Sequence, residues 1–122
     1  MLNLNSVMIR TKQAKSLAAF YEKVLGQPAG MVDEGQSYWG WQVGSTFLSV
    51  MDHSEMMGST KDPGRVMINF ETPDVKSEFA RIKGLGAAVI KEPYQMGEAW
   101  IATLADLDGN YFQLLTPMDS TT

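Results

Sequence analysis

Hydrophobic residues near the start of the chain alternate with polar ones and then change to the spacing of a helix. Val7 and Ile9 share one face of a predicted strand. From Leu17 to Leu25 the hydrophobic positions recur every three or four residues, which is typical of an amphipathic helix, and Gly26 ends the pattern. Turn-forming residues then separate short apolar runs. The expected elements are a strand over residues 3–10, a helix over 15–25 and strands over 30–33, 38–43 and 46–51.

The same succession of patterns returns after a polar segment over residues 53–64 that is rich in Ser, Gly, Asp and Pro. Thr72 is the expected N-cap of a second helix, and Pro73 is its expected first residue. Because Val66-Met67-Ile68 repeats Val7-Met8-Ile9, the chain is predicted to contain one β-α-β-β-β unit twice. The expected elements are a strand over residues 66–71, a helix over 74–83, a strand over 87–90, a loop over 91–97 and hairpin strands over 100–105 and 111–115.

The closing hairpin is expected to turn through the acidic segment Asp106-Leu107-Asp108-Gly109-Asn110. Gln113 follows in the middle of the second hairpin strand. A four-residue loop would place Trp100 on the same sheet face as Gln113, whereas a five-residue loop would place Ile101 and Thr103 there. The sequence leaves both loop lengths open.

These patterns predict an α+β fold in a single domain of 122 residues. Module 1 is expected over about residues 1–52, a linker over 53–64 and module 2 over about 65–118. One helix for roughly four strands leaves one face of each sheet uncovered. That face is expected to meet a ligand, a partner or another chain.

Composition narrows the classes of function. A hydrophobic content of 44% and a charged content of 20% are those of a globular protein, and the absence of cysteine excludes disulfides and thiolate zinc sites. A net charge of -4 and a pI near 4.8 argue against nucleic-acid binding and mildly favour a cationic ligand. The sequence shows neither a secretory signal nor an apolar run of membrane-spanning length, so a cytoplasmic protein without a membrane partner is expected.

The duplicated unit resembles the glyoxalase/bleomycin-resistance/dioxygenase family, also called the vicinal oxygen chelate superfamily, over essentially the whole chain. The resemblance implies two modules whose curved mixed sheets surround an open cavity, with the helices outside. It also implies that two chains pair as a homodimer. The segments that carry it are Phe20-Tyr21 and Val24-Leu25-Gly26 in the first helix, Ile68-x-Phe70 before Asp74, and the turn from Asp106 to Asn110.

Metal-dependent members of this superfamily hold a divalent ion with four side chains, two from each half. The resemblance places these positions at Ser6, Ser49, Met67 and Gln113. Two hydroxyls, a thioether and an amide suit Mg, Mn, Fe or Zn poorly, because these ions prefer carboxylate or imidazole ligands. We therefore expect no metal and no cofactor, since a metal site would need His53, Asp52, Glu55 or Glu71 instead.

Aromatic residues are densest in Tyr38-Trp39-Gly40-Trp41, where Trp39 and Trp41 share one strand face. These two tryptophans could form a stacking wall for a flat or cationic ligand, with Trp100 opposite, or they could fill the core or a dimer interface. The residues expected to bind a ligand are Ser6, Met8, Arg10, Trp39, Trp41, Ser49, Met67, Asn69, Trp100 and Gln113.

The sequence predicts a metal-free protein that binds a small molecule, planar or cationic, as bleomycin-resistance-type sequestering proteins do. The alternative is a lyase, isomerase or dioxygenase-like enzyme of the same superfamily, either metal-independent or with unconventional metal ligands. In a third hypothesis the protein acts through its dimer surface. The sequence contains no recognisable nucleophile or triad, so no catalytic residue is assigned.

Overall fold

A computed structural model describes residues 1–117 of the chain. The chain divides into two compact units, one from Met1 to Gly58 and the other beginning at Ser59. The division falls inside the segment over residues 53–64 that we expected to be a linker. The expected second module ended at residue 118, which lies outside the described residues.

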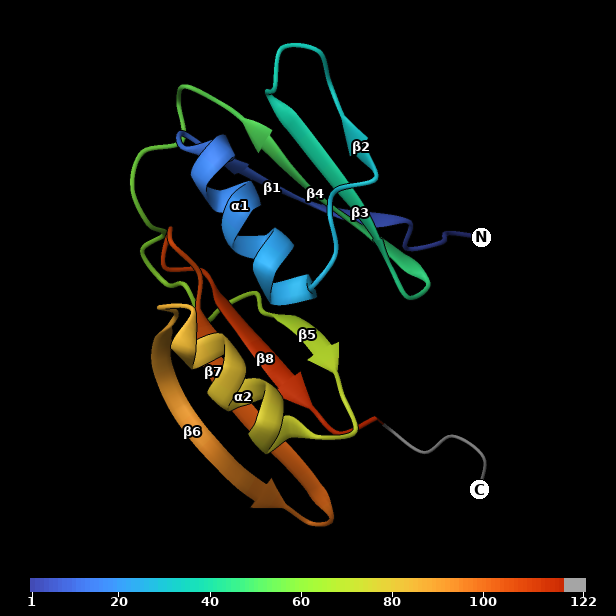
Figure 1. Cartoon of the computed structure of the whole chain (residues 1–122), viewed down its shortest axis with the longest axis vertical. Helices are drawn as coiled ribbons and strands as arrows, with labels where there is room; N and C mark the ends of the chain where they lie inside the picture. The colour runs from blue at the N-terminus through green and yellow to red at the C-terminus, as the bar shows by residue number, and fades with distance from the viewer. Residues whose placement is uncertain (118–122) are drawn as a thin grey trace. The chain divides into compact units, whose positions relative to one another are not determined.

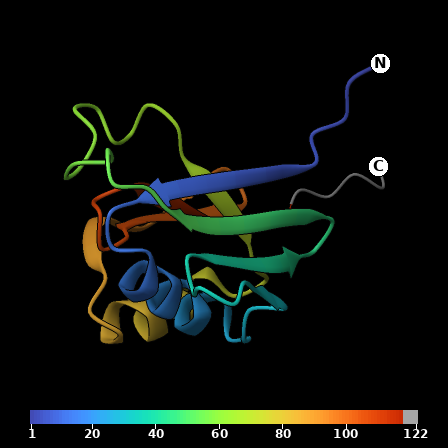
Figure 2. The same ribbon diagram turned by 90° about the horizontal axis from the view of Figure 1, so that it is seen from above.

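The first unit is a four-stranded mixed sheet with one helix on one of its faces (Figures 1 and 2). The strand order is β1-β4-β3-β2, in which β1 runs parallel to β4 and the other neighbours are antiparallel. This is the predicted β-α-β-β-β order. Its elements are β1 (Ser6–Thr11), α1 (Ala14–Leu25), β2 (Met31–Val32), β3 (Tyr38–Val43) and β4 (Thr46–Asp52).

The core of this unit lies between α1 and the sheet. Leu17 and Tyr21 of the predicted apolar stripe are fully buried, as are Trp41 and Val50 from the strands. The helix ends where the sequence predicted, because Gly26 adopts a left-handed φ of 72° and its N–H donates a 2.9 Å bond to the Glu22 carbonyl.

The second unit repeats this architecture (Figure 1). Its strand order is β5-β8-β7-β6, with β5 parallel to β8 and the remaining pairs antiparallel. The α+β fold with two helix-and-sheet modules is therefore confirmed. The elements are β5 (Ile68–Glu71), α2 (Val75–Gly84), β6 (Ala88–Met96), β7 (Ala99–Ala105) and β8 (Tyr111–Leu115).

Helix α2 begins later than the sequence predicted. The N-cap is Asp74, whose carboxylate accepts a 3.1 Å bond from the Ser77 N–H, so the prediction that Thr72 caps the helix was wrong. The Thr72 hydroxyl instead accepts from the Asp74 N–H at 3.2 Å and shapes the approach to the cap. Phe79 and Ile82 are buried against the sheet.

The closing hairpin has the five-residue loop. Ala105 pairs with Tyr111, and residues 106–110 form the turn between them. The Asp106 carboxylate organises the turn, because it accepts bonds from the backbone N–H groups of Asp108 and Asn110 at 2.9 and 3.0 Å. The acidic segment in the sequence is therefore explained by turn geometry.

Strand β6 differs most from the element that the sequence predicted. A strand over residues 87–90 and a loop over 91–97 were expected, but one strand runs from Ala88 to Met96. Two irregularities in its pairing with β7 interrupt the alternation of side chains, and Pro93 lies in the second of them, where an edge strand tolerates proline. In the described part of the chain, neither α1 nor α2 has the length and apolarity needed to cross a membrane.

Candidate functional site

Each sheet has one face covered by its helix and one face without a helix, which we call the open face. In the first unit, Val7 and Ile9 of β1 pair with Leu48 and Val50 of β4 on the face that α1 covers. The alternate residues therefore make up the open face of the first sheet. They are Ser6, Met8, Arg10, Met31, Tyr38, Gly40, Gln42, Phe47, Ser49 and Met51.

Small residues lie at the middle of this open face. Ser49 pairs with Met8 on one side and Gly40 on the other, and it is only 2% exposed. The Phe47 ring lies directly over Gly40, because a methyl group added there would be 2.6 Å from its Cε2 atom. Met8 and Met51 are partly exposed. The centre of the face is thus a hydroxyl enclosed by an aromatic ring and thioethers.

The open face of the second sheet is more polar. Gln113 pairs with Asn69 in β5 and Thr103 in β7, and its side-chain amide donates a 3.2 Å bond to the Thr103 hydroxyl. Lys91 and Tyr94 of β6 belong to the same face, although the sequence analysis had placed both in a loop. The residues of this face are Asn69, Glu71, Ala88, Lys91, Tyr94, Met96, Ala99, Ile101, Thr103, Ala105, Tyr111, Gln113 and Leu115.

The tryptophans lie on the helix-covered faces. Trp39 and Trp41 pair with Val50 and Leu48, and Trp41 is fully buried, so Trp41 belongs to the core and offers no surface to a ligand. This was the alternative to a stacking wall that the sequence left open. Trp100 is next to Ile101, which faces the open side, and the Lys76 ammonium of α2 lies 3.9 Å from its ring centre.

The other seven of the ten expected ligand-binding residues are divided between the two units. Ser6, Met8, Arg10 and Ser49 share the open face of the first sheet. Asn69 and Gln113 are paired on the open face of the second. Met67 precedes β5 and is 37% exposed.

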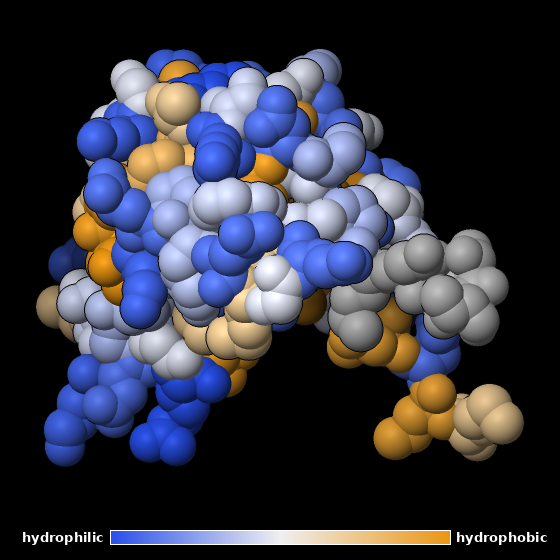
Figure 3. All heavy atoms as spheres, turned by 90° about the horizontal axis from the view of Figure 1, so that it is seen from below, coloured by the Kyte–Doolittle hydropathy of each residue, from blue (hydrophilic) through white to orange (hydrophobic). Residues whose placement is uncertain are grey.

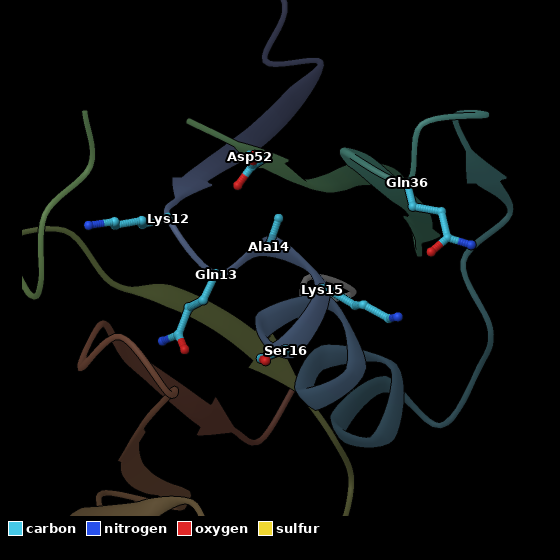
Figure 4. Close-up of a pocket in the computed structure, with 7 residues that line it drawn as sticks. All are labelled: Lys12, Gln13, Ala14, Lys15, Ser16, Gln36 and Asp52. Atoms are coloured by element: carbon cyan, nitrogen blue, oxygen red, sulfur yellow. The ribbon is translucent and has the colours of Figure 1, made fainter. Parts of the chain in front are cut away.

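A surface pocket of about 240 Å³ lies at the start of α1 (Figure 4). Its lining includes Lys12, Lys15 and Asp52. The two lysine side chains point in opposite directions in Figure 4, so they do not converge on one anion. Asp52 also adds negative charge to the lining. The pocket is therefore a polar surface hollow with no concentrated charge.

Hydrophobic residues reach the surface in several places between polar ones (Figure 3). Methionines contribute strongly, since Met8, Met31 and Met51 on the first open face are 49%, 56% and 38% exposed. Flexible, polarisable thioethers adapt to ligands of different shape. This composition suits a binding surface that accepts varied apolar groups.

A model of the glyoxalase-like domain matches residues 6–115. The chain belongs to the glyoxalase-like domain family. Among curated proteins, none matches this chain.

Solved structures share the glyoxalase-like fold at low sequence identity. A glyoxalase/bleomycin resistance protein from Albidiferax ferrireducens T118 is 17% identical with a TM-score of 0.75, covering 93% of this chain and 98% of its own. A glyoxalase/bleomycin resistance protein/dioxygenase family enzyme from Burkholderia phytofirmans PsJN is 22% identical with a TM-score of 0.75, covering 96% and 100%. A glyoxalase-related enzyme from Fulvimarina pelagi is 13% identical with a TM-score of 0.79, covering 98% and 94%.

The side chains at the four positions where the resemblance places metal ligands do not fit a divalent ion. Ser49 is buried between neutral neighbours, and the Gln113 amide is already bonded to Thr103. The remaining positions offer a hydroxyl at Ser6 and a thioether at Met67. Over residues 1–117, no three His, Cys, Asp or Glu side chains lie close enough together to hold a metal.

The single histidine of the chain also has a local role. His53 Nδ1 accepts a 3.2 Å bond from the Glu55 N–H, and the His53 N–H donates to the Thr11 carbonyl at 2.8 Å. These bonds fix the turn that follows β4. His53, one of the residues that could replace the missing metal ligands, is therefore used in loop structure.

Proposed function

We propose that this glyoxalase-like protein binds and sequesters a small, planar and largely apolar molecule without a metal ion, in the cytoplasm. The observation that carries the proposal is the centre of the first open face. There Ser49 lies at a position where the resemblance places a metal ligand, and Met8, Phe47 and Met51 surround it with apolar groups. A partly polar, largely apolar surface is typical of ligand sites.

Binding is favoured over catalysis by what the acidic residues do. The Asp106 carboxylate accepts three hydrogen bonds within the hairpin turn, and Asp33 accepts bonds from Ser37 and Tyr38 before β3. Both carboxylates therefore stabilise turns. A general base needs a carboxylate or imidazole within reach of its substrate, with a partner that orients it. On the open faces over residues 1–117, Glu71 is the one acid, and no side-chain hydrogen bond or ion pair found there orients it.

A second copy of the chain is proposed to complete the walls of the site. Each open face leaves apolar side chains in water in a single chain, and a two-fold pair would enclose them in two equivalent sites. The proposed partners are thus a small molecule and an identical chain, with neither nucleic acid nor membrane.

The binding test uses N-phenyl-1-naphthylamine, a neutral aromatic probe that fluoresces in apolar surroundings. The unmodified protein should give a saturable signal. Met8→Asp places a charge on the first open face and should weaken binding about tenfold or more. Met57→Asp, at a loop residue that is 69% exposed, is the matched control and should change affinity less than about twofold. Equal effects of the two variants on affinity would contradict a binding site on the first open face.

The metal-free state is tested by elemental analysis after dialysis and by thermal unfolding with added Mn, Fe, Ni or Zn. We expect far less than one ion per chain and an unchanged melting temperature, because an ion that binds only the folded state raises it. A stoichiometric ion, or a clear rise in melting temperature with one of the four, would support the enzyme alternative.

A further inference from the structure

Four polar side chains form a straight row across the open face of the second sheet. Asn69 of β5 pairs with Gln113 of β8, Gln113 pairs with Thr103 of β7, and Thr103 pairs with Lys91 of β6. Directly paired residues project from the same side of a sheet. The bond from the Gln113 amide to the Thr103 hydroxyl confirms this for the middle of the row. We call these four residues the polar row.

Lys91 reaches the polar row because strand β6 is irregular on both sides of it. Val89 pairs with Leu104 and Lys91 with Thr103, so one extra residue, Ile90, is inserted in β6. With regular pairing, Ile90 would lie opposite Thr103 and Lys91 would fall on the face that α2 covers. Bulges that redirect a side chain in this way are common beside functional sites.

A second irregularity restores the pairing beyond Lys91. Tyr94 pairs with Ile101, so three steps along β6 match two along β7. Tyr94 therefore also lies on the open face, where the Lys91 ammonium is 4.7 Å from its ring centre. The first irregularity brings Lys91 to the open face, where regular pairing would put Ile90, and the second keeps Tyr94 on that face beside it.

No ion pair joins the Lys91 ammonium to a carboxylate among residues 1–117. Glu71 lies on the same face, but on β5, at the opposite edge of the sheet. Three strand spacings separate the two, about 14 Å. Lys91 is therefore available to a ligand.

The hydrogen-bonding capacity of the polar row suits an anion. An ammonium has three donors and no acceptor, and each side-chain amide has two N–H donors. One N–H of Gln113 is used by Thr103, which leaves the other, together with the amide of Asn69. Charge-assisted bonds to an oxyanion are stronger than bonds between neutral groups.

We propose that the polar row binds the negatively charged oxyanion group of an otherwise apolar aromatic ligand on the open face of the second sheet, with Lys91 as the residue that selects its charge. The polar row lies wholly in the second unit, so this inference goes beyond the proposed function, which concerns the open face of the first sheet. It replaces the expectation of a cationic ligand, which derived from the net charge of the whole chain and from tryptophans that lie on the helix-covered faces. The charge on the open face of the second sheet is set locally by Lys91.

Two fluorescent probes with the same ring skeleton test the proposal. 8-Anilinonaphthalene-1-sulfonate carries an oxyanion, and N-phenyl-1-naphthylamine lacks it. The unmodified protein should bind the sulfonate about tenfold more tightly. Lys91→Met removes the charge but keeps an apolar side chain, and it should abolish this preference while changing affinity for the neutral probe less than about twofold.

Lys83→Met is the matched control, because Lys83 is an exposed lysine on α2, over the opposite face of the sheet. It should retain the preference for the sulfonate, and so should Lys91→Arg, which keeps the charge. Circular dichroism establishes that each variant is folded, and Lys91→Gln replaces Lys91→Met if the latter is not.

The outcomes separate the two proposals. If both probes bind equally, or if Lys91→Met weakens both to the same extent, the role of the polar row is overturned while the binding function stands. If neither probe binds to the unmodified protein, the binding function fails and the proposal for the polar row fails with it.

Discussion

Phe20 and Phe79 attach the two helices to their sheets. Each is 6% exposed, and the Phe20 ring makes an edge-on contact with the Tyr21 ring, with 5.3 Å between their centres. The spacing of hydrophobic positions in each helix predicts that both residues are buried. The two rings have the same role in the two modules, as expected if the chain contains one unit twice.

Phe20→Ala and Phe79→Ala should each lower the free energy of unfolding by about 3 to 5 kcal/mol, because each removes a buried ring and leaves a cavity. Urea denaturation measures the loss. Ser16→Ala, at an exposed position of α1, is the control and should change the free energy by less than about 0.5 kcal/mol. An unchanged unfolding midpoint for Phe20→Ala would contradict the position of that ring.

Asp33 should make stability depend on pH. Hydrogen bonds from the Ser37 hydroxyl and from the backbone N–H groups of Ser37 and Tyr38 hold the pKa of its carboxyl below the ordinary value of 3.8. Because the pKa is lower in the folded state, the ionised carboxylate stabilises the fold above pH 3.8, and this contribution is lost as the pH falls through the folded value.

Asp33→Ala should therefore lower the melting temperature near neutral pH, and the gap to the unmodified protein should narrow in acid. Melting curves across this range measure the gap. Glu34→Ala, at the neighbouring exposed acid, controls for the change in net charge. A gap that stays constant down to the most acidic condition would show that the Asp33 bonds do not depend on its ionisation.

At the scale of elements, β3 and β4 are joined by the close approach of Gly40 and Phe47. A methyl group at position 40 would collide with the Phe47 ring, so Gly40→Ala should cost about 1 to 3 kcal/mol of stability. Phe47→Leu should offset part of that cost, because the shorter side chain leaves room for the methyl group. The two changes should be coupled by about 0.5 to 3 kcal/mol in a double-mutant cycle.

Gly30→Ala provides the control for this cycle, since no atom lies within 4 Å of the added methyl group and the backbone there has no positive φ. It should leave stability nearly unchanged. Additive effects of Gly40→Ala and Phe47→Leu would mean that the ring does not occupy the space above Gly40.

The succession of elements could be predicted because helices and strands impose different spacings on hydrophobic residues. The stripe from Leu17 to Val24 could only be one face of a helix, and α1 was placed to within a residue. Strand β6 could not be predicted, because its two irregularities shift the alternation and bring Lys91 and Pro93 into a strand. Lys91, which we propose selects the charge of the ligand, was missed as a site residue for the same reason.

The sheet face on which each tryptophan lies depends on tertiary structure. Alternation shows that Trp39 and Trp41 share a face, but it does not show which face of β3 the helix covers. The sheet face on which Trp100 lies depends on the length of the hairpin loop, and the turn residues alone do not determine that length. The five-residue loop that formed puts Thr103, and not Ala102, beside Gln113.

For the whole molecule we predict a homodimer. The exposed methionines of the first open face would be removed from water by a second copy, which is a favourable transfer of about 25 cal/mol for each Å² of apolar surface. Light scattering at micromolar concentration should give twice the chain mass of 13.5 kDa. A mass of one chain under these conditions would contradict the assembly. The open faces would then have no second chain to cover them.

The parallel pairing of the first and last strands in each unit determines the order in which each unit can fold. Ser6 pairs with Phe47 and Ile68 with Phe112, so these contacts join residues far apart in sequence. The hairpins β3–β4 and β7–β8 are local and close within microseconds, whereas the parallel pairs must first overcome the entropy of closing a long loop. During synthesis on the ribosome, β1 therefore has no strand to pair with until β4 has left the exit tunnel.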